Sequence, residues 1–262
     1  MKGVAISLFN PRCPVEERER AWIEESMEWL RGEFGVAPLN VPVILPTSEY
    51  FPPPFYGSDG EVRAVVHSVA RYMGVQADVD VQFSEDLDHA QNLRRLFPGR
   101  MGTLRSSGAA GSYADTDADG PRVVTIDRSN ISEPARLVAV IAHELGHIRL
   151  LGERRIDSGR RDQEPLTDLV TVYLGMGIFT ANAAYSFGRI SGYEIEPAGG
   201  WQSRRLGYMT EQMFGYALAR YAVYRGEPDP PWAGYLDTNP RAYMKQGIRY
   251  LRHAGHDVDR YR

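Results

Sequence analysis

The amino-acid sequence predicts an α+β fold in which a small, mostly antiparallel sheet lies over one apolar helix and the C-terminal half is helical. Three observations carry this prediction. The segments that indicate strands all lie before residue 128, apolar residues at helical spacing cover residues 132–151, and the patterns beyond residue 164 are helical. The length of 262 residues suits a single domain, 1–262, with an N-terminal helix and Pro-rich extended segment at 1–57 and a core at 58–262.

Three patterns describe the first 57 residues. Residues 1–10 hold a short apolar run that ends in Asn-Pro, which favours a strand. Residues 15–34 place apolar side chains at helical spacing and are followed by Gly35, as in an amphipathic helix that ends there. Six prolines stand among aromatic and β-branched residues between positions 38 and 57, so we expect that stretch to be extended along the surface.

The next segment begins with a capping box. Ser58 and Glu61 stand three residues apart before an apolar helical pattern, which predicts a helix that continues to about Met73. Residues 79–83 then alternate between apolar and polar side chains, as a half-buried strand does. Residues 84–107 contain no pattern from which we predict an element.

A β-hairpin is predicted directly before the apolar helix. Residues 111–114 and 122–127 flank an acidic turn sequence at 117–120, which ends in Asp-Gly. The acids of this turn alternate as in a calcium-binding loop, but the glycine and the terminal glutamate that an EF-hand requires are missing. We therefore predict no calcium site.

The helix predicted at 132–151 has signals at both ends. Ser132 can cap its N-terminus, Glu133 and Pro134 suit its first turn, and Gly152 suits its end. Its apolar residues recur at helical spacing: Leu137, Val138, Val140, Ile141, Leu145, Ile148 and Leu151.

Residues 143–147 of that helix read His-Glu-Leu-Gly-His, an HExxH motif. Residues four apart on an α-helix share a face, with Cβ atoms roughly 5–6 Å apart, so His143 and His147 can bind one metal ion. Glu144 lies about 100° from His143 around the helix, where its carboxylate flanks the ion and can act as a general base. Zinc bound in this way lowers the pKa of a water molecule towards ~7. The alternative, two hydrogen-bonded core histidines without a metal, leaves costly buried polar groups to satisfy.

A third ligand has to come from another segment, and a second predicted helix that runs to Phe179 supplies the candidates. We predict Glu164 as the third ligand and Asp168 as the acceptor for the free N–H of a ligating imidazole, with Asp168 as the alternative ligand. That helix is apolar on nearly every side apart from one stripe of polar residues at three- and four-residue spacing: Glu164, Thr167, Asp168 and Thr171.

Two further helices are predicted near the C-terminus, at 206–224 and 240–253, with a Pro-rich loop around Trp232 between them. We expect them to close the back of the metal site.

Together, the HExxH motif and the downstream ExxxD helix resemble the gluzincin branch of the zincin-like metallopeptidases over residues 121–180. The resemblance implies a zincin-like fold and one Zn²⁺ per chain, and it makes residues 58–262 a catalytic core. The loop between His147 and Glu164 is shorter than in the best-known members, which keeps the Asp168 alternative open. Carried over by position, the roles are zinc ligand for His143, His147 and Glu164, general base for Glu144, and orientation of a histidine for Asp168.

The metzincin pattern does not fit. It needs a glycine at position 150 and a histidine or aspartate at position 153, where this chain has Leu150 and Glu153.

The resemblance also implies an oxyanion donor from a later segment and a strand beside the active-site helix that receives the substrate in extended form. We name Tyr216 for the donor role, although the candidates that stay open are Tyr208, Tyr216, His253 and His256. We expect one of the two hairpin strands to receive the substrate. His67 and His89 have no partner at ligand spacing.

The function predicted in this way is zinc-dependent hydrolysis of peptide bonds, with a peptide or protein as the substrate. The alternative is a catalytically silent zincin-fold module that binds or regulates. An intact Glu144 favours turnover, because a binding module has no use for a base beside the water.

Composition limits the partners and the compartment. The net charge is −4, and the densest basic cluster, at 154–161, is interrupted by acidic residues, so we expect no nucleic-acid partner. The longest apolar segment, 169–179, is too short to span a bilayer, so we expect no membrane partner. Cys13 is the single cysteine, which excludes an intramolecular disulfide and a Cys-rich zinc site. With no secretory signal at 1–10, we expect a cytoplasmic protein.

Overall fold

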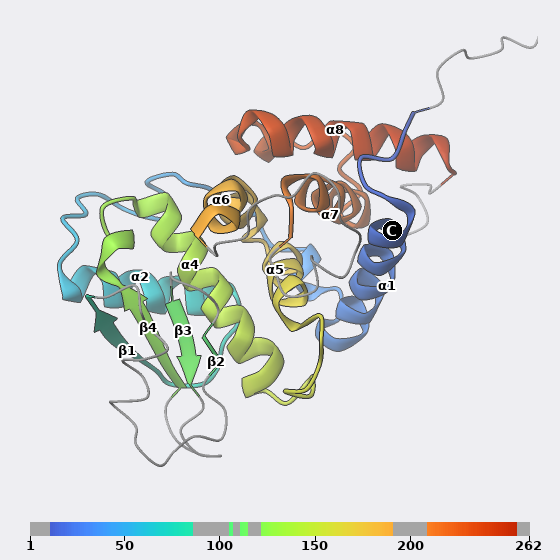
Figure 1. Ribbon diagram of the computed structural model, residues 1–262. Helices are drawn as coiled ribbons and strands as arrows, with labels where there is room; N and C mark the ends of the chain where they lie inside the picture. Colours follow the sequence, from blue (N-terminus) through green and yellow to red (C-terminus); the bar gives the residue numbers. More distant parts are fainter. Residues whose placement is uncertain (1–10, 86–104, 107–110, 115–121, 191–208, 256–262) are drawn as a thin grey trace, which may run out of the picture.

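The computed structural model describes residues 11–85, 105–106, 111–114, 122–190 and 209–255 (Figure 1). It is a mostly helical α+β structure with one small sheet. The strand predicted at 1–10 lies outside the described residues, as do His89, Tyr208 and His256. No helix among the residues that the structure describes is both long and apolar enough to cross a membrane.

The first helix, α1 (Glu17–Phe34), confirms the prediction for residues 15–34. Its N-terminus is closed by a capping box between Glu16 and Glu19, and Gly35 follows its end with a positive φ of 67°. The apolar face of α1 is fully buried through Ile23, Met27 and Leu30.

After α1 the chain makes one 3₁₀ turn, Ala37–Leu39, and then has no helix or strand up to position 58, as expected, although a hydrogen-bonded turn at 47–51 interrupts the predicted extended path. The segment is held against the core: the Ile44 N–H donates to the Gly175 carbonyl over 3.1 Å, and the Phe51 ring packs edge-on against Phe179. The six prolines suit this path because they have no N–H to give to a helix or a ladder.

Helix α2 (Asp59–Tyr72) begins with the predicted capping box, in which the Glu61 N–H donates to the Ser58 hydroxyl and the Ser58 N–H to the Glu61 carboxylate. Strand β1 (Val79–Ser84) follows, as predicted from residues 79–83. Helix α2 packs beside this strand and also touches the helix that carries the HExxH motif.

Four strands form the sheet in the order β1-β4-β3-β2. The predicted hairpin is confirmed: β3 (Gly111–Ala114) and β4 (Arg122–Asp127) pair antiparallel, with Tyr113 opposite Val124. The short strand β2 (Arg105–Ser106) pairs antiparallel with β3, whereas β1 pairs parallel with β4. Two of the three pairings are thus antiparallel.

The sheet topology narrows one expectation, that a hairpin strand receives the substrate. Strand β4 lies between β1 and β3, whereas β3 pairs with β4 on one side and with β2 on the other only at Ser112 and Tyr113. Strand addition needs unpaired N–H and C=O groups, so the topology argues against β4, and the expectation for β3 stays a prediction.

The HExxH motif lies on α4 (Pro134–His147), the most central helix, every residue of which is buried from Leu137 onward. The predicted cap is wrong: Glu133, not Ser132, is the N-cap residue, because Pro134 takes the first helical position, where its fixed φ and missing N–H are favourable. The chain continues into a π-helical turn, Ile148–Gly152, and the helical backbone ends at Gly152 as predicted.

The single helix predicted up to Phe179 is in fact two. Helix α5 (Gln163–Tyr173) ends before Gly175, which has φ of 85°, and α6 (Gly177–Ile190) begins two residues later. The physical reason is the left-handed conformation of Gly175, which turns the chain and directs its carbonyl to the Ile44 N–H.

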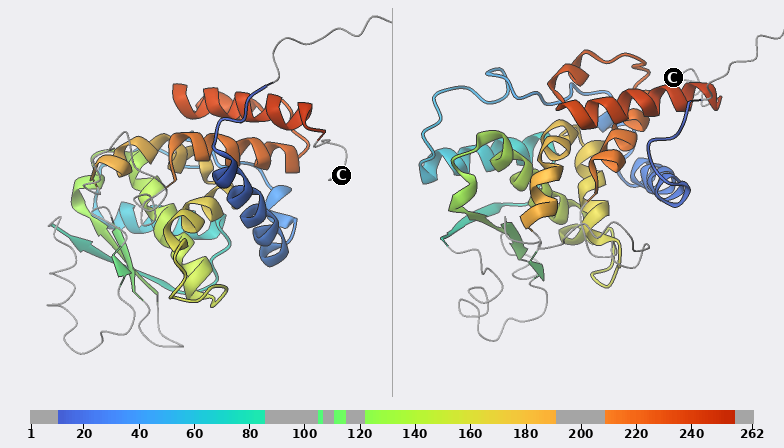
Figure 2. Two further views of the ribbon diagram at one scale, coloured as in Figure 1. Left: turned by 45° about the vertical axis from the view of Figure 1, so that its right-hand side comes forward. Right: turned by 45° about the horizontal axis from the view of Figure 1, so that its top comes forward.

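Helices α7 (Glu211–Tyr224) and α8 (Thr238–His253) confirm the two C-terminal helices, although α7 starts later than predicted, at a Thr210 cap. Helix α7 packs against α1, α5 and α6, and α8 lies along α7 (Figure 2). The close approach of α7 and α8 depends on Gly215, since a Cβ there would meet the Tyr243 Cβ at 2.4 Å. Helix α7 also contacts α5, the helix that carries Glu164.

Helix α4 therefore lies between two layers. It touches β3 and β4 on one side and α5 and α6 on the other, which places its histidines at the boundary between sheet and helices (Figure 1).

Candidate metal centre

Three side chains from two helices converge in the interior. His143 and His147 project from the same face of α4, and Glu164 reaches them from the first turn of α5. One possible ligand atom from each residue lies within 4.8 Å of the other two. The two imidazole rings are 4.9 Å apart between centroids and nearly perpendicular, at 87°. The predicted grouping of these three residues is confirmed, and the group could hold a metal ion.

His143 is oriented by a carboxylate behind it. Its Nδ1 lies 2.9 Å from the Asp168 Oδ1, and its Nε2 faces the Glu164 Oε2 at 3.3 Å. The second oxygen of Asp168 accepts the Met209 backbone N–H over 2.8 Å. Asp168 thus contacts the His143 nitrogen that faces away from Glu164, and its supporting role stays a prediction.

His147 also points its Nε2 at Glu164, with 3.5 Å between that nitrogen and the Oε2. Its Nδ1 lies 3.2 Å from the Thr167 Oγ1. A single carboxylate oxygen of Glu164 is therefore shared by the Nε2 atoms of both histidines.

The electrostatics of the group follow from burial and pairing. Burial by itself lowers the pKa of His143, but hydrogen bonds to Asp168 and Glu164 outweigh it and raise the pKa well above 6.5. Burial raises the pKa of Glu164, yet the hydrogen bond from His143 and the electrostatic interaction with the nearby His147 dominate and hold that pKa well below its usual value of 4.5. Glu164 is thus an anion aimed at two imidazole nitrogens.

The donor set fits zinc. Two imidazole nitrogens and one carboxylate oxygen are ligands that Zn²⁺ accepts, and catalytic zinc sites commonly have three protein ligands. The His147 Nε2 is a buried nitrogen with no hydrogen-bond partner within the described part of the chain. A cation among the three residues would satisfy it, because a buried polar atom without a partner is otherwise costly.

Glu144 follows His143 on α4 and is also buried, with 1% of its surface exposed. On an ideal helix its position is about 100° from that of His143 and about 60° from that of His147 around the axis. Glu164 is the most accessible of these residues, with 22% of its side chain exposed.

Tyr216, which we named as an oxyanion donor, lies in a different cluster. Its buried hydroxyl donates to the Glu24 Oε1 of α1 over 2.5 Å, and its ring packs near Tyr250. The structure does not bring it together with the histidines of α4, and we do not carry it into the proposal. His253 is exposed at the end of α8.

Three residues make contacts that the sequence did not predict: Gln163 and Thr167 lie beside His147, and Met209 donates to Asp168. Thr167 belongs to the polar stripe recognised in the sequence, so its position was visible but its role was not. Gln163 directly precedes Glu164, and this position in the sequence is only a weak indication of its contact with His147. Met209 contributes its backbone N–H, so its residue type does not predict the contact.

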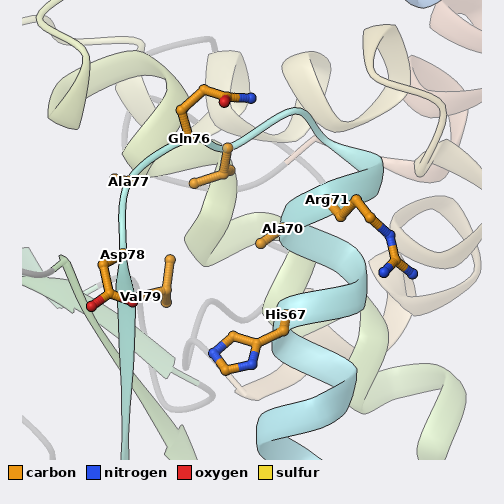
Figure 3. Close-up of a pocket in the computed structure, with 8 residues that line it drawn as sticks. His67, Ala70, Arg71, Gln76, Ala77, Asp78 and Val79 are labelled. Atoms are coloured by element: carbon orange, nitrogen blue, oxygen red, sulfur yellow. The ribbon is translucent and has the colours of Figure 1, made fainter.

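A separate hollow of about 350 Å³ lies between α2 and the start of β1 (Figure 3). His67 lines it, but Arg71 extends away from Asp78 and from the strand, so the polar groups around the hollow do not converge on one point. We therefore assign no site there.

The basic cluster at 154–161 is at least partly neutralised. Arg155 pairs with Glu33 at 3.0 Å and with Glu153 at 2.8 Å, and Arg160 pairs with Asp162 at 2.7 Å.

In comparisons with protein-family models, curated proteins and solved structures, no match to this chain was found.

Proposed function

We propose that this protein is a zinc-dependent metallopeptidase with a zincin-like, gluzincin-type site. The observation that supports this most is the convergence of the His143 Nε2, the His147 Nε2 and the Glu164 Oε2, with Glu144 next to His143 on the same helix. An HExxH motif supplies only two of the three protein ligands that a catalytic zinc commonly has. Glu164, an anionic residue of α5, supplies a candidate for the third.

The proposed roles follow from the chemistry of each group. A zinc ion held by the three residues would lower the pKa of a water molecule towards ~7 and polarise a peptide carbonyl. Glu144 would be the general base there: its carboxylate would take up a proton and pass it to the leaving amine. Asp168 keeps the His143 ring turned so that its Nε2, not its Nδ1, faces the ligand position. The substrate is a peptide or a protein.

The second candidate is a zincin-fold module that binds metal without turnover. It is favoured by one observation, the burial of the centre: His143, Glu144 and His147 are each at most 3% exposed. A structural or regulatory metal site needs no route for a substrate, whereas a peptidase does.

The first experiment measures metal content. Elemental analysis of protein purified without chelator should find close to one zinc per chain, and the content should fall sharply in His143→Ala and in His147→Ala. A wild-type protein without metal would remove both candidates.

The second experiment separates them. Glu144→Gln should retain zinc and lose hydrolysis of an unstructured protein substrate such as casein, because the amide cannot accept the proton. A search for newly formed peptide termini in a cell extract, comparing wild type with Glu144→Gln, identifies the substrate. Equal and zinc-dependent turnover by the two proteins would contradict the role of Glu144, and zinc without turnover in either protein would favour the binding module.

A further inference from the structure

Thr167 occupies an unusual place beside the metal centre. It is fully buried on α5, one turn after Gln163. Its hydroxyl oxygen lies 2.9 Å from the Gln163 carbonyl oxygen and 3.2 Å from the His147 Nδ1. The same hydroxyl therefore touches a proposed zinc ligand and the turn of α5 that carries another one.

The chemistry of these atoms determines where the protons lie. A carbonyl oxygen can only accept, so the Thr167 hydroxyl proton is given to the Gln163 carbonyl. Toward His147 the hydroxyl then presents a lone pair, and a hydrogen bond between them requires a proton on the His147 Nδ1. In a neutral imidazole with a proton on Nδ1, the Nε2 carries the lone pair. That Nε2 is the atom that faces Glu164.

The side-chain amide of Gln163 is a poorer acceptor for the His147 Nδ1 proton than the Thr167 hydroxyl. The Gln163 Nε2 is 3.5 Å from the His147 Nδ1, and an N–H facing an N–H makes no hydrogen bond. Reversing the amide would still leave a longer contact than the 3.2 Å to Thr167. The Thr167 oxygen is thus the better acceptor of the two.

Packing holds the Thr167 side chain in this orientation. A Cβ built on Gly146 would lie 2.9 Å from the Thr167 Cγ2 and 3.2 Å from its carbonyl oxygen, so the threonine methyl lies directly over the backbone of Gly146. Threonine is stiff at χ1, and in a helix its hydroxyl bonds the carbonyl four residues back, as it does here with Gln163. With the methyl against Gly146, the hydroxyl faces His147.

We propose that Thr167 is a positioning residue for the metal centre: its hydroxyl holds His147 in the tautomer whose Nε2 binds metal and ties that ring to the turn carrying Glu164. The inference deepens the proposed function and rests on its metal site. Under this proposal the two histidines differ in the group that orients them: a buried carboxylate for His143 and a neutral hydroxyl for His147.

The test compares three variants of the full-length protein for zinc affinity, measured by competition with a chelating dye. Thr167→Val keeps the shape and removes the hydroxyl, so zinc binding should weaken about 10–100-fold. Thr167→Ser keeps the hydroxyl and should restore affinity to within a few-fold of wild type. Thr171→Val is the matched control, because Thr171 is equally buried one turn on but its hydroxyl bonds Asp168 O and Thr180, not an imidazole. It should bind zinc as wild type does.

A spectroscopic measurement keeps the proposal testable even if Thr167→Val does not fold. Long-range ¹H–¹⁵N spectra of the imidazoles in the zinc-loaded wild type should show a proton on the His147 Nδ1, and that proton should exchange faster with water in the valine variant. A purely structural role for Thr167 would lower stability without changing this signal.

The outcomes separate the two proposals. If the wild type binds one zinc but Thr167→Val binds it as tightly as Thr171→Val, the positioning role is overturned and the metal site stands. If His147 of the zinc-loaded protein carries its proton on Nε2, that nitrogen is not a ligand, and both the positioning role and the proposed ligand geometry are overturned. If the wild type binds no zinc, the proposed function fails and this inference fails with it.

Discussion

The substitution Gly146→Ala tests the packing that brings the proposed metal ligands together. Gly146 is the residue between Leu145 and His147 in the HExxH motif, and it lies where α5 crosses α4. A Cβ added there would meet the Thr167 Cγ2 at 2.9 Å, the Thr167 carbonyl oxygen at 3.2 Å and the Val170 Cγ1 at 3.3 Å. One of these contacts is backbone, so a side-chain rotation cannot relieve all three and α5 has to move.

The magnitude is the balance of two effects. Overpacking of a tight core costs about 1–3 kcal/mol. Replacing glycine by alanine within a helix returns roughly 0.5–1 kcal/mol. The net expectation is a loss of about 1–2 kcal/mol in the free energy of unfolding. Because α5 carries Glu164 and Thr167, the same displacement should weaken zinc binding by on the order of tenfold, the equivalent of about 1.4 kcal/mol.

The assay is urea unfolding in the presence of EDTA, followed by zinc titration of each folded protein. The matched control is Gly32→Ala on α1, where an added Cβ would meet nothing within 4 Å. That variant should gain roughly 0.5–1 kcal/mol and keep wild-type zinc affinity. If Gly146→Ala were as stable as Gly32→Ala and bound zinc equally well, the close crossing of α4 and α5 would not be what positions the ligands.

Four further predictions concern the centre and the clusters around it. Asp168→Asn should weaken zinc binding about 10–100-fold and Glu164→Gln should weaken it more, because only the second change removes a ligand; the reverse order in a zinc titration would make Asp168 the ligand. The pKa of His143 is raised in the folded protein because the imidazolium pairs with Asp168 and Glu164. In EDTA, this pairing should therefore contribute its full stabilisation below about pH 6.5, and the stabilisation should be lost as the pH rises through the raised pKa. The Tm without metal should therefore fall with rising pH above that range, whereas saturating zinc should abolish the fall because the ion replaces the proton; a flat profile in EDTA would contradict the pairing. Burial raises the pKa of the Cys13 thiol, so iodoacetamide at pH 8 should alkylate it more slowly in the folded than in the urea-unfolded chain, and equal rates would count against its burial. Tyr216→Phe should lower the free energy of unfolding by about 1 kcal/mol, because it removes the hydrogen bond to the Glu24 carboxylate, and it should leave the zinc content unchanged. A loss of zinc in this variant would indicate that Tyr216 contributes to the metal site.

The sequence predicted helix ends correctly where they depend on interactions between neighbouring residues. The capping box of Ser58 and Glu61 forms as predicted, and so does the end of α1 at Gly35. Each of these features depends on backbone groups within a few residues, so short-range rules suffice. The start of α4 was misplaced by one residue because two local signals competed there, and Pro134 at the first helical position prevailed over the Ser132 cap.

The predictions from sequence were wrong where contacts between segments far apart in the chain determine the structure. Apolar periodicity runs through Gly175 without interruption, yet the helix breaks there because the Gly175 carbonyl bonds Ile44 in a segment more than 100 residues earlier. The pairing of β2 with Ser112 and Tyr113 covers part of the β3 edge that the hairpin alone left open. Tyr216 was a reasonable donor by its position in the chain, but its hydroxyl is bonded to Glu24 of α1.

The α-helical repeat alone sets His143 and His147 on one face with Glu144 beside them, whatever packs around that helix. The packing of α5 against α4 completes the group. It directed the Glu164 oxygen to both Nε2 atoms and placed Asp168 and Thr167 behind the two rings, and this depends on the angle and spacing at which α5 crosses α4. Helical periodicity says which residues share a face, but contact across two helices is set by side-chain packing at their crossing, which no spacing within one helix encodes.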